Sequence, residues 1–199
     1  SSEMTFIALN NYKQLIADPI IPLTIKNDFF LVVWKVVFIT LLATFFAVAL
    51  TRLKLRESGF WRIIFFLPNI LSVVVIGILW MFIYNPDFGM MNGFLRLIGL
   101  DHLARPWLGD PEWALISLIP PSVWAGIGFY MILIMAGILN IPSSLYEAAK
   151  MDGANEWQQF TKVTLPLTWE QIKLSILSII ITTLNGSYVI VQLMTQGGP

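Results

Sequence analysis

The sequence predicts an all-α, polytopic transmembrane helix bundle, and two observations carry this prediction. The chain is 57% hydrophobic and only 12% charged, whereas about a quarter of the residues in soluble domains are charged. Four apolar segments reach the roughly 20 residues that a helix needs to cross a hydrocarbon core of about 30 Å. They lie near residues 29–50, 60–84, 113–139 and 172–194. All are expected to be helical, because lipid offers no partner for backbone polar groups.

The segment before these spans, residues 1–28, is expected to lie at the extracytoplasmic interface, and residues 29–199 form the transmembrane domain. Within the first segment, residues 10–19 predict a short amphipathic helix that ends at Asp18-Pro19, because a proline disfavours helical geometry in the residue before it. Lys35 interrupts the first span near one end. We expect it to snorkel to the membrane boundary rather than to act as a buried functional cation.

Prolines interrupt the next two spans. Pro68 lies inside the second span, and Pro120 and Pro121 lie inside the third. A proline removes a backbone hydrogen bond and bends a helix, which membrane proteins tolerate where a neighbour or a cavity satisfies the freed carbonyl. Bends are therefore expected in both spans.

The charges of the links between spans predict the orientation. The first link and its flank hold a single acidic residue, Glu57, against the basic residues Arg52, Lys54, Arg56 and Arg62. The second link holds more acidic than basic residues. Since cytoplasmic loops carry an excess of Lys and Arg, the first link is predicted to be cytoplasmic. By parity the loop at residues 143–167 is cytoplasmic too, and both ends of the chain lie outside.

The loop at 143–167 is unusually polar for a connection between two spans, and it predicts two short helices. Ser143 or Ser144 can cap the first, which Gly153 can end in a left-handed conformation. The second, at about 156–163, carries an apolar stripe and is expected to stop at Leu165-Pro166. From the residues alone, a docking element and an amphipathic hairpin that merely covers the bundle remain equal alternatives.

Composition also excludes several classes of function. The formal net charge is +0, which argues against a nucleic-acid partner. The absence of cysteine excludes disulfides and thiolate metal sites, and the single histidine, His102, cannot form an imidazole metal site alone. None of the four predicted spans contains Asp, Glu, His or Cys. No catalytic residue and no metal site is therefore predicted, and an intramembrane enzyme is disfavoured.

Glu147-Ala148-Ala149, Gly153 and Leu165-Pro166 resemble, in type and spacing, the EAA motif of binding-protein-dependent ABC permeases. The flanking sequence is similar to one branch of that family, the carbohydrate permeases of the maltose and glycerol-phosphate type. The short segments that show this similarity are Ile141-Pro142, Asp152-Gly153-Ala154, Trp157-Gln158-Gln159-Phe160, Trp107-Leu108-Gly109-Asp110-Pro111, Leu67-Pro68 and Met194-Thr195-Gln196-Gly197-Gly198-Pro199. The resemblance runs from about Asn11 to Pro199.

The resemblance implies a type I ABC-importer permease fold whose cytoplasmic loop forms a coupling helix. It implies a permease subunit of an ATP-driven importer for a sugar, an oligosaccharide or a glycerol-phosphate-like solute. The implied coupling residues are Glu147, Ala148, Ala149, Gly153, Leu165 and Pro166. Two alternatives remain open: a permease for a non-carbohydrate solute, such as peptides or amino acids, and a non-catalytic structural membrane subunit.

The implied partners are a second permease subunit, an ABC ATPase dimer and an extracytoplasmic solute-binding protein, in the cytoplasmic (inner) membrane of a bacterium or archaeon. The chain is not expected to be an enzyme. It has no phosphate-binding Gly-rich loop that ends in Lys-Ser or Lys-Thr. No cofactor is therefore expected in this chain, and ATP and magnesium are expected in the partner ATPase.

The sequence departs from the family pattern in two respects. Such permeases have six or more spans, so the chain is expected to lack a first span before Ser1 and a last span after Pro199. Sugar permeases also often carry an acidic residue shortly before the closing Thr-x-Gly-Gly-Pro, where this chain has residues 191–194, Val-Gln-Leu-Met. A role for a carboxylate at that place is therefore not expected.

Polar residues in the fourth span are the candidates for the substrate path. They are Thr182, Asn185, Tyr188 and Gln192, whose spacings of three, three and four place them on one helical face. Amides and an aromatic ring suit the hydroxyls and faces of sugars, while hydrogen bonding between helices is an equal alternative. Trp124 in the third span is a further candidate, although packing is the favoured role for an aromatic residue there.

Overall fold

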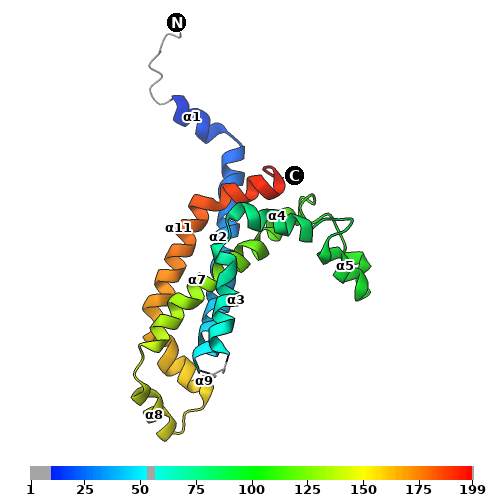
Figure 1. Cartoon of the computed structure of the whole chain (residues 1–199). Coiled ribbons are helices and arrows are strands. Elements are labelled where there is room, and N and C mark those ends of the chain that lie inside the picture. The colour runs from blue at the N-terminus through cyan, green and yellow to red at the C-terminus, as the bar shows by residue number, and fades with distance from the viewer. Residues whose placement is uncertain (1–9, 53–56, 199) are drawn as a thin grey trace.

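The chain is described here by a computed structural model that covers residues 10–52 and 57–198. Within these residues every regular element is a helix, and three long ones form the centre: α2 (Ile20–Arg52), α7 (Ile119–Leu139) and α11 (Trp169–Thr195). They pack against one another (Figure 1). Each is long and apolar enough to cross a membrane. The predicted all-α bundle is confirmed.

Helix α2 is longer than the first predicted span. It begins at Ile20 rather than near residue 29, after the short helix α1 (Asn10–Ala17). Its 33 residues extend about 50 Å at 1.5 Å per residue, well beyond a hydrocarbon core of about 30 Å. Nothing breaks the helix before Phe29, because Pro22 lies in the first turn, where its missing N–H has no intrahelical partner to lose.

The second predicted span is two helices rather than one. α3 (Ser58–Ile70) and α4 (Val73–Ile83) meet at 99°. Pro68 weakens the last turn of α3, and Ser72 starts α4 as an N-cap whose side chain accepts a backbone hydrogen bond. The bend expected at Pro68 is therefore a complete break just beyond it, and α4 leaves the direction of α3 (Figure 1).

The third predicted span is one candidate membrane span, Ala114–Leu139, with an interruption of one residue near its start. Pro120 and Pro121 stand in the first turn of α7, where proline is favoured, and Leu118 separates α7 from the short helix α6 (Ala114–Ser117). The interruption therefore lies directly before the two prolines, and α7 is unbroken from Ile119 to Leu139.

The buried core lies where α2, α7 and α11 meet. Ala43, Met131 and Ile134 are fully buried, and Ile39 and Ile179 are almost so. The small side chain of Ala43 lets α2 approach its neighbours closely. Large apolar side chains cover the outside of the same helices, as expected where a surface faces lipid or another subunit.

Helices α3 and α7 cross at a glycine. A Cβ at Gly128 would overlap the backbone of Phe65 and Phe66. The two backbones therefore touch directly, which only a residue without a side chain allows.

The segment between α4 and α6 is fixed by one buried side chain, that of Asn92 in α5 (Met90–Leu97). Its Nδ2 donates to the carbonyls of Pro86 and Arg105, and its Oδ1 accepts from the Trp107 indole N–H at 2.8 Å. A further turn, η1 (Asp101–Leu103), follows α5. These bonds tie α5 to the residues that precede it and to those that follow η1.

The two links predicted to be cytoplasmic lie at the same end of the molecule. The C-terminal end of α2, the start of α3, and the helices α8 (Ser143–Met151) and α9 (Glu156–Gln159) gather there, opposite α1 and the C-terminal end of α11 (Figure 1). Arg52 and Arg62 belong to this end. Lys54 and Arg56 lie outside the described residues.

Candidate functional site

The loop at 143–167 begins with α8, which ends in a Schellman motif at Gly153. Gly153 has a φ of +78°, its N–H donates to Lys150 O at 3.0 Å, and Ala154 N–H donates to Ala149 O at 2.9 Å. The predicted left-handed glycine is thus present. The expected serine cap is wrong: Pro142 occupies the N-cap position, Ser143 is already helical, and no side chain caps the helix.

The second half of the loop does not stop at Leu165-Pro166. A capping box between Asn155 and Gln158 starts α9, and the chain continues as a π-helix, η2 (Phe160–Thr164), and as α10 (Leu165–Leu167). Pro166 is tolerated because it lies in the first turn of α10. Only Thr168 separates α10 from α11. The loop therefore runs into α11 with little interruption.

Arg52, the last residue of α2, holds both halves of this loop. Its Nη2 donates to Gln159 Oε1 at 2.9 Å, and its guanidinium carbon lies 3.7 Å from the centre of the Tyr146 ring. Glu156 Oε2 lies 3.9 Å from Arg52 Nη2, but the Glu156 side chain is 75% exposed, so this ion pair contributes little to stability. The stacked, hydrogen-bonded guanidinium joins α2 to α8 and α9.

A buried hydroxyl pair adds a second attachment. Tyr146 of α8 and Thr164 of η2 are both buried, and their hydroxyl oxygens lie 3.0 Å apart in a hydrogen bond. Tyr146 therefore contacts α2 through its ring and η2 through its hydroxyl. This one residue fixes which side of α8 faces the bundle.

The opposite side of α8 is exposed to solvent. Glu147 and Ala148 are exposed and Ala149 is half-buried. Two apolar side chains are also strongly exposed, Met151 at 89% and Trp157 at 70%. Exposed apolar side chains on a helix outside the predicted spans indicate an interaction surface. The six predicted coupling residues thus divide: Glu147, Ala148, Ala149 and Gly153 lie on or directly after α8, whereas Leu165 and Pro166 lie at the base of α11.

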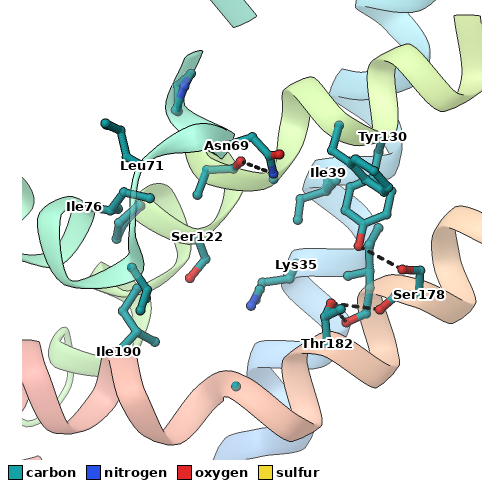
Figure 2. A pocket seen from close by; sticks show the side chains of 18 residues that line it. Lys35, Ile39, Asn69, Leu71, Ile76, Ser122, Tyr130, Ser178, Thr182 and Ile190 are labelled. Carbon is teal, nitrogen blue, oxygen red and sulfur yellow. Dashed lines mark hydrogen bonds between the residues drawn. The ribbon is translucent and has the colours of Figure 1, made fainter. Parts of the chain in front are cut away.

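A cavity of about 530 Å³ opens between α2, the α3–α4 break, α7 and α11. Figure 2 shows Lys35 extending into it from α2, between Ser122 of α7 and Thr182 of α11. Tyr130 and Ser178 share a hydrogen bond of 3.3 Å at its edge. Lys35, which was expected to snorkel to the membrane boundary, lines this cavity.

The predicted substrate-path residues do not come together. Thr182 lines the cavity with Ser178, which lies one turn before it on α11. Asn185, Tyr188 and Gln192 are exposed on an adjoining face of α11, and Tyr188 is 73% exposed. Trp124 is 37% exposed and packs edge-on against Trp80, with 6.3 Å between the centres of the two rings.

Sequence reasoning missed two groups of residues. Arg52 was identified only as a topology signal, and no local pattern links it to Tyr146 or Gln159, which lie far along the chain. The second group lines the cavity and consists of Ser122, Tyr130 and Ser178. One sequence pattern could have indicated Ser178: it lies four residues before Thr182, which places both side chains on the same helical face.

Comparison with known families agrees with this architecture. The family described as the inner membrane component of binding-protein-dependent transport systems matches residues 39–198. The chain belongs to this family, and its resemblance to the carbohydrate branch is confirmed by relatives that include the lactose permease LacF of Rhizobium radiobacter, 34% identical over 82% of this chain and 55% of that protein. It is a multi-pass protein of the inner membrane.

Other similar proteins cover almost all of the chain. A probable ABC transporter permease protein, YurN of Bacillus subtilis, is 39% identical over 100% of this chain and 68% of its own length. The diacetylchitobiose permease NgcF of Streptomyces coelicolor is 29% identical over 100% of this chain and 59% of its own. A crystal structure of a bacterial ABC transporter for the acidic polysaccharide alginate matches with a TM-score of 0.88 and 26% identity, over 98% of this chain and 68% of that one. The chain thus spans between 55% and 68% of the length of these four proteins.

Proposed function

We propose that this chain is the transmembrane permease subunit of an ATP-driven importer for a sugar or oligosaccharide. An ABC ATPase dimer drives it through the loop at 143–167, and a second permease subunit and an extracytoplasmic solute-binding protein complete the importer. ATP and magnesium bind in the ATPase, and this chain carries out no catalysis of its own. The observation that carries the proposal is α8, which is anchored to the bundle on one side and exposed on the other.

The attachments of α8 determine which helices move. Arg52 joins α8 to α2, while the helical path through η2 and α10 leads from the loop into α11. A displacement of α8 by the ATPase therefore acts on two of the three central helices at once. Because α2 and α11 also pack on each other, they move together rather than separately.

The coupling residues then have distinct roles. Ala148 gives the ATPase groove close access to α8, Glu147 offers it an exposed carboxylate, and Gly153 sets the angle between the two halves of the loop. Leu165 and Pro166 do not touch the ATPase in this proposal. They lie at the junction through which the movement reaches α11.

The exposed polar face of α11 supports a shared transport path. Asn185, Tyr188 and Gln192 lie within a membrane-crossing helix but are exposed in this chain. Polar side chains at membrane depth avoid lipid and face other helices or water. We therefore place the second permease subunit against this face, with the solute passing between the two subunits, and Trp124 outside that passage.

The names of the relatives support a saccharide as the solute. The similar proteins include permeases for diacetylchitobiose and lactose and a transporter for alginate. Ser122, Tyr130 and Thr182 supply hydroxyl groups to the cavity, which suits a ligand rich in hydroxyls.

The proposal is tested with the full-length chain, purified with its second permease and ATPase in proteoliposomes. Ala148→Arg introduces bulk and charge on the exposed side of α8, so it is expected to abolish ATPase association and solute-stimulated ATP hydrolysis. Glu170→Arg is the matched control, because Glu170 is exposed at the base of α11 and pairs with the exposed Lys173. It is expected to retain both.

Uptake then separates the classes of solute. Radiolabelled lactose, diacetylchitobiose, an acidic oligosaccharide, a dipeptide and an amino acid are supplied together with the cognate binding protein. Uptake of a saccharide alone is the expected result. Uptake of the dipeptide or the amino acid without any saccharide would contradict the proposed saccharide substrate. Solute-stimulated ATP hydrolysis at the wild-type level in the Ala148→Arg importer would contradict the proposed coupling.

A further inference from the structure

Among the described residues that line the cavity between α2, α7 and α11, Lys35 carries the single charge. Lys35 lies about 25 Å along α2 from Arg52, well inside the long helix. Among the described residues, no hydrogen bond or ion pair forms to its ammonium group. Every other residue that lines the cavity is uncharged. A lone cation at membrane depth is costly unless it pairs or performs a function.

The side chain of Lys35 turns into the bundle, where it lines the cavity together with residues of α3, α7 and α11. In Figure 2 the side chain points into the cavity and lies between Ser122 and Thr182. Water or a ligand in the cavity, rather than lipid, therefore solvates the charge.

The neighbouring polar groups complete a site for a hydroxylated anion. Ser122 Oγ donates to Leu118 O, and Thr182 Oγ1 donates to Ser178 O, both at 2.8 Å. Because each hydroxyl has used its proton, its oxygen remains available to accept a hydrogen bond from a ligand hydroxyl. Asn69 Nδ2 donates to Ala125 O at 3.3 Å, which leaves its Oδ1 as a further acceptor. Lys35 alone supplies full positive charge.

We propose that this cavity binds an acidic saccharide, with Lys35 pairing the anionic group and the oxygens of Ser122, Thr182 and Asn69 accepting hydrogen bonds from sugar hydroxyls. The volume of about 530 Å³ suits one or two sugar rings, since ligand sites of about 300–1,000 Å³ are usual. This inference rests on the proposed transport function and names the class of its substrate: a sugar that carries a carboxylate, sulfonate or phosphate. Neutral sugars lack the group that Lys35 requires.

The test exploits the absence of cysteine from residues 1–199. Ser122→Cys places one thiol in the cavity of the full importer, with any cysteine elsewhere in it removed. The thiol is treated with a negatively charged and a positively charged methanethiosulfonate reagent, and the ratio of the two reaction rates is measured. The ratio removes any effect of Lys35 on the reactivity of the thiol, because that effect is common to both reagents.

With Lys35 present, the anionic reagent is expected to react faster, and Lys35→Met is expected to lower the anion-to-cation ratio about tenfold or more. Lys35→Arg, which keeps the charge, should preserve the ratio. Thr24→Cys, exposed near the outer end of the same helix, serves as the control thiol. Its ratio should not change in Lys35→Met.

Protection by ligands then identifies the chemistry. Glucuronate and glucose 6-phosphate are expected to slow labelling of the cavity thiol by the cationic reagent, and glucose at equal concentration is not. The protection should disappear in Lys35→Met. If just one of the two acids protects the thiol, the result shows whether the site prefers a carboxylate or a phosphate.

Two results would overturn the inference: equal protection by glucose, or a reagent ratio that does not depend on Lys35. The second result would mean that the partner permease supplies a counter-charge. ATPase stimulation and uptake are measured in parallel on the importer that keeps Ser122, so a failure of this inference with intact transport is distinguishable from a failure of the proposed function.

Discussion

Replacing Arg52 by methionine is expected to release α8 from α2 without unfolding the bundle. The substitution keeps most of the side-chain volume but removes the hydrogen bond to Gln159 and the guanidinium stack on Tyr146. A hydrogen bond to a charged group contributes about 1.5–3 kcal/mol, and a cation–π contact contributes about 0.5–2 kcal/mol. The Glu156 ion pair adds less than about 1 kcal/mol, because that carboxylate is exposed.

These contributions overlap, so we expect a loss of about 2–4 kcal/mol in the free energy that holds α8 on the bundle. A loss of about 3 kcal/mol raises the population of detached α8 on the order of a hundredfold. Native-state hydrogen exchange of the importer, followed by mass spectrometry on peptides that cover 143–160, measures this opening directly. Solute-stimulated ATP hydrolysis should persist while uptake falls, because the ATPase still contacts α8 but no longer moves α2.

Three control variants sharpen this prediction. Arg52→Lys keeps a cation near Tyr146 but loses the forked donor, so an intermediate increase in exchange is expected. Glu156→Gln and Lys173→Met change exposed charges at the same end and should alter exchange less than threefold. If Arg52→Met leaves exchange of α8 within threefold of the wild type, or if Glu156→Gln has the same effect as Arg52→Met, then the stacked and hydrogen-bonded guanidinium does not hold the loop.

Three further predictions concern the backbone and the segment between α4 and α6. Gly153→Ala forces a side chain into a left-handed conformation at a cost of about 1–2 kcal/mol, and it should lower uptake per ATP hydrolysed; unchanged coupling would show that the turn tolerates other angles. Gly128→Ala should lower the thermal midpoint of the detergent-solubilised protein, at a cost of about 1–3 kcal/mol, because its Cβ would overlap the α3 backbone, whereas Gly93→Ala meets no neighbour and should not. Asn92→Leu should destabilise the segment between α4 and α6 by about 2–5 kcal/mol and speed its cleavage by proteases, because the Trp107 indole and the Arg105 backbone lose their acceptor; equal cleavage rates would contradict this.

Much of the fold follows from local patterns in the sequence. Apolar length identifies the positions of the spans, since lipid forces every such segment to be helical whatever its neighbours are. Gly153 ends α8 as expected, because a Schellman motif depends on the residues of a single turn. The helix breaks were harder to foresee. Leu165-Pro166 failed as a stop signal because a proline in the first turn of a helix loses no hydrogen bond.

The side-chain arrangement of the candidate sites was not predictable in the same way. The sequence by itself determined that α8 is a separate helix between two spans and that its Glu147-Ala148-Ala149 face resembles a coupling motif. Only the tertiary structure decided that Arg52 anchors this helix and that Lys35 points into a cavity. The physical reason is distance along the chain: each of these contacts joins residues from different helices, and it exists only after α2, α7 and α11 have packed together.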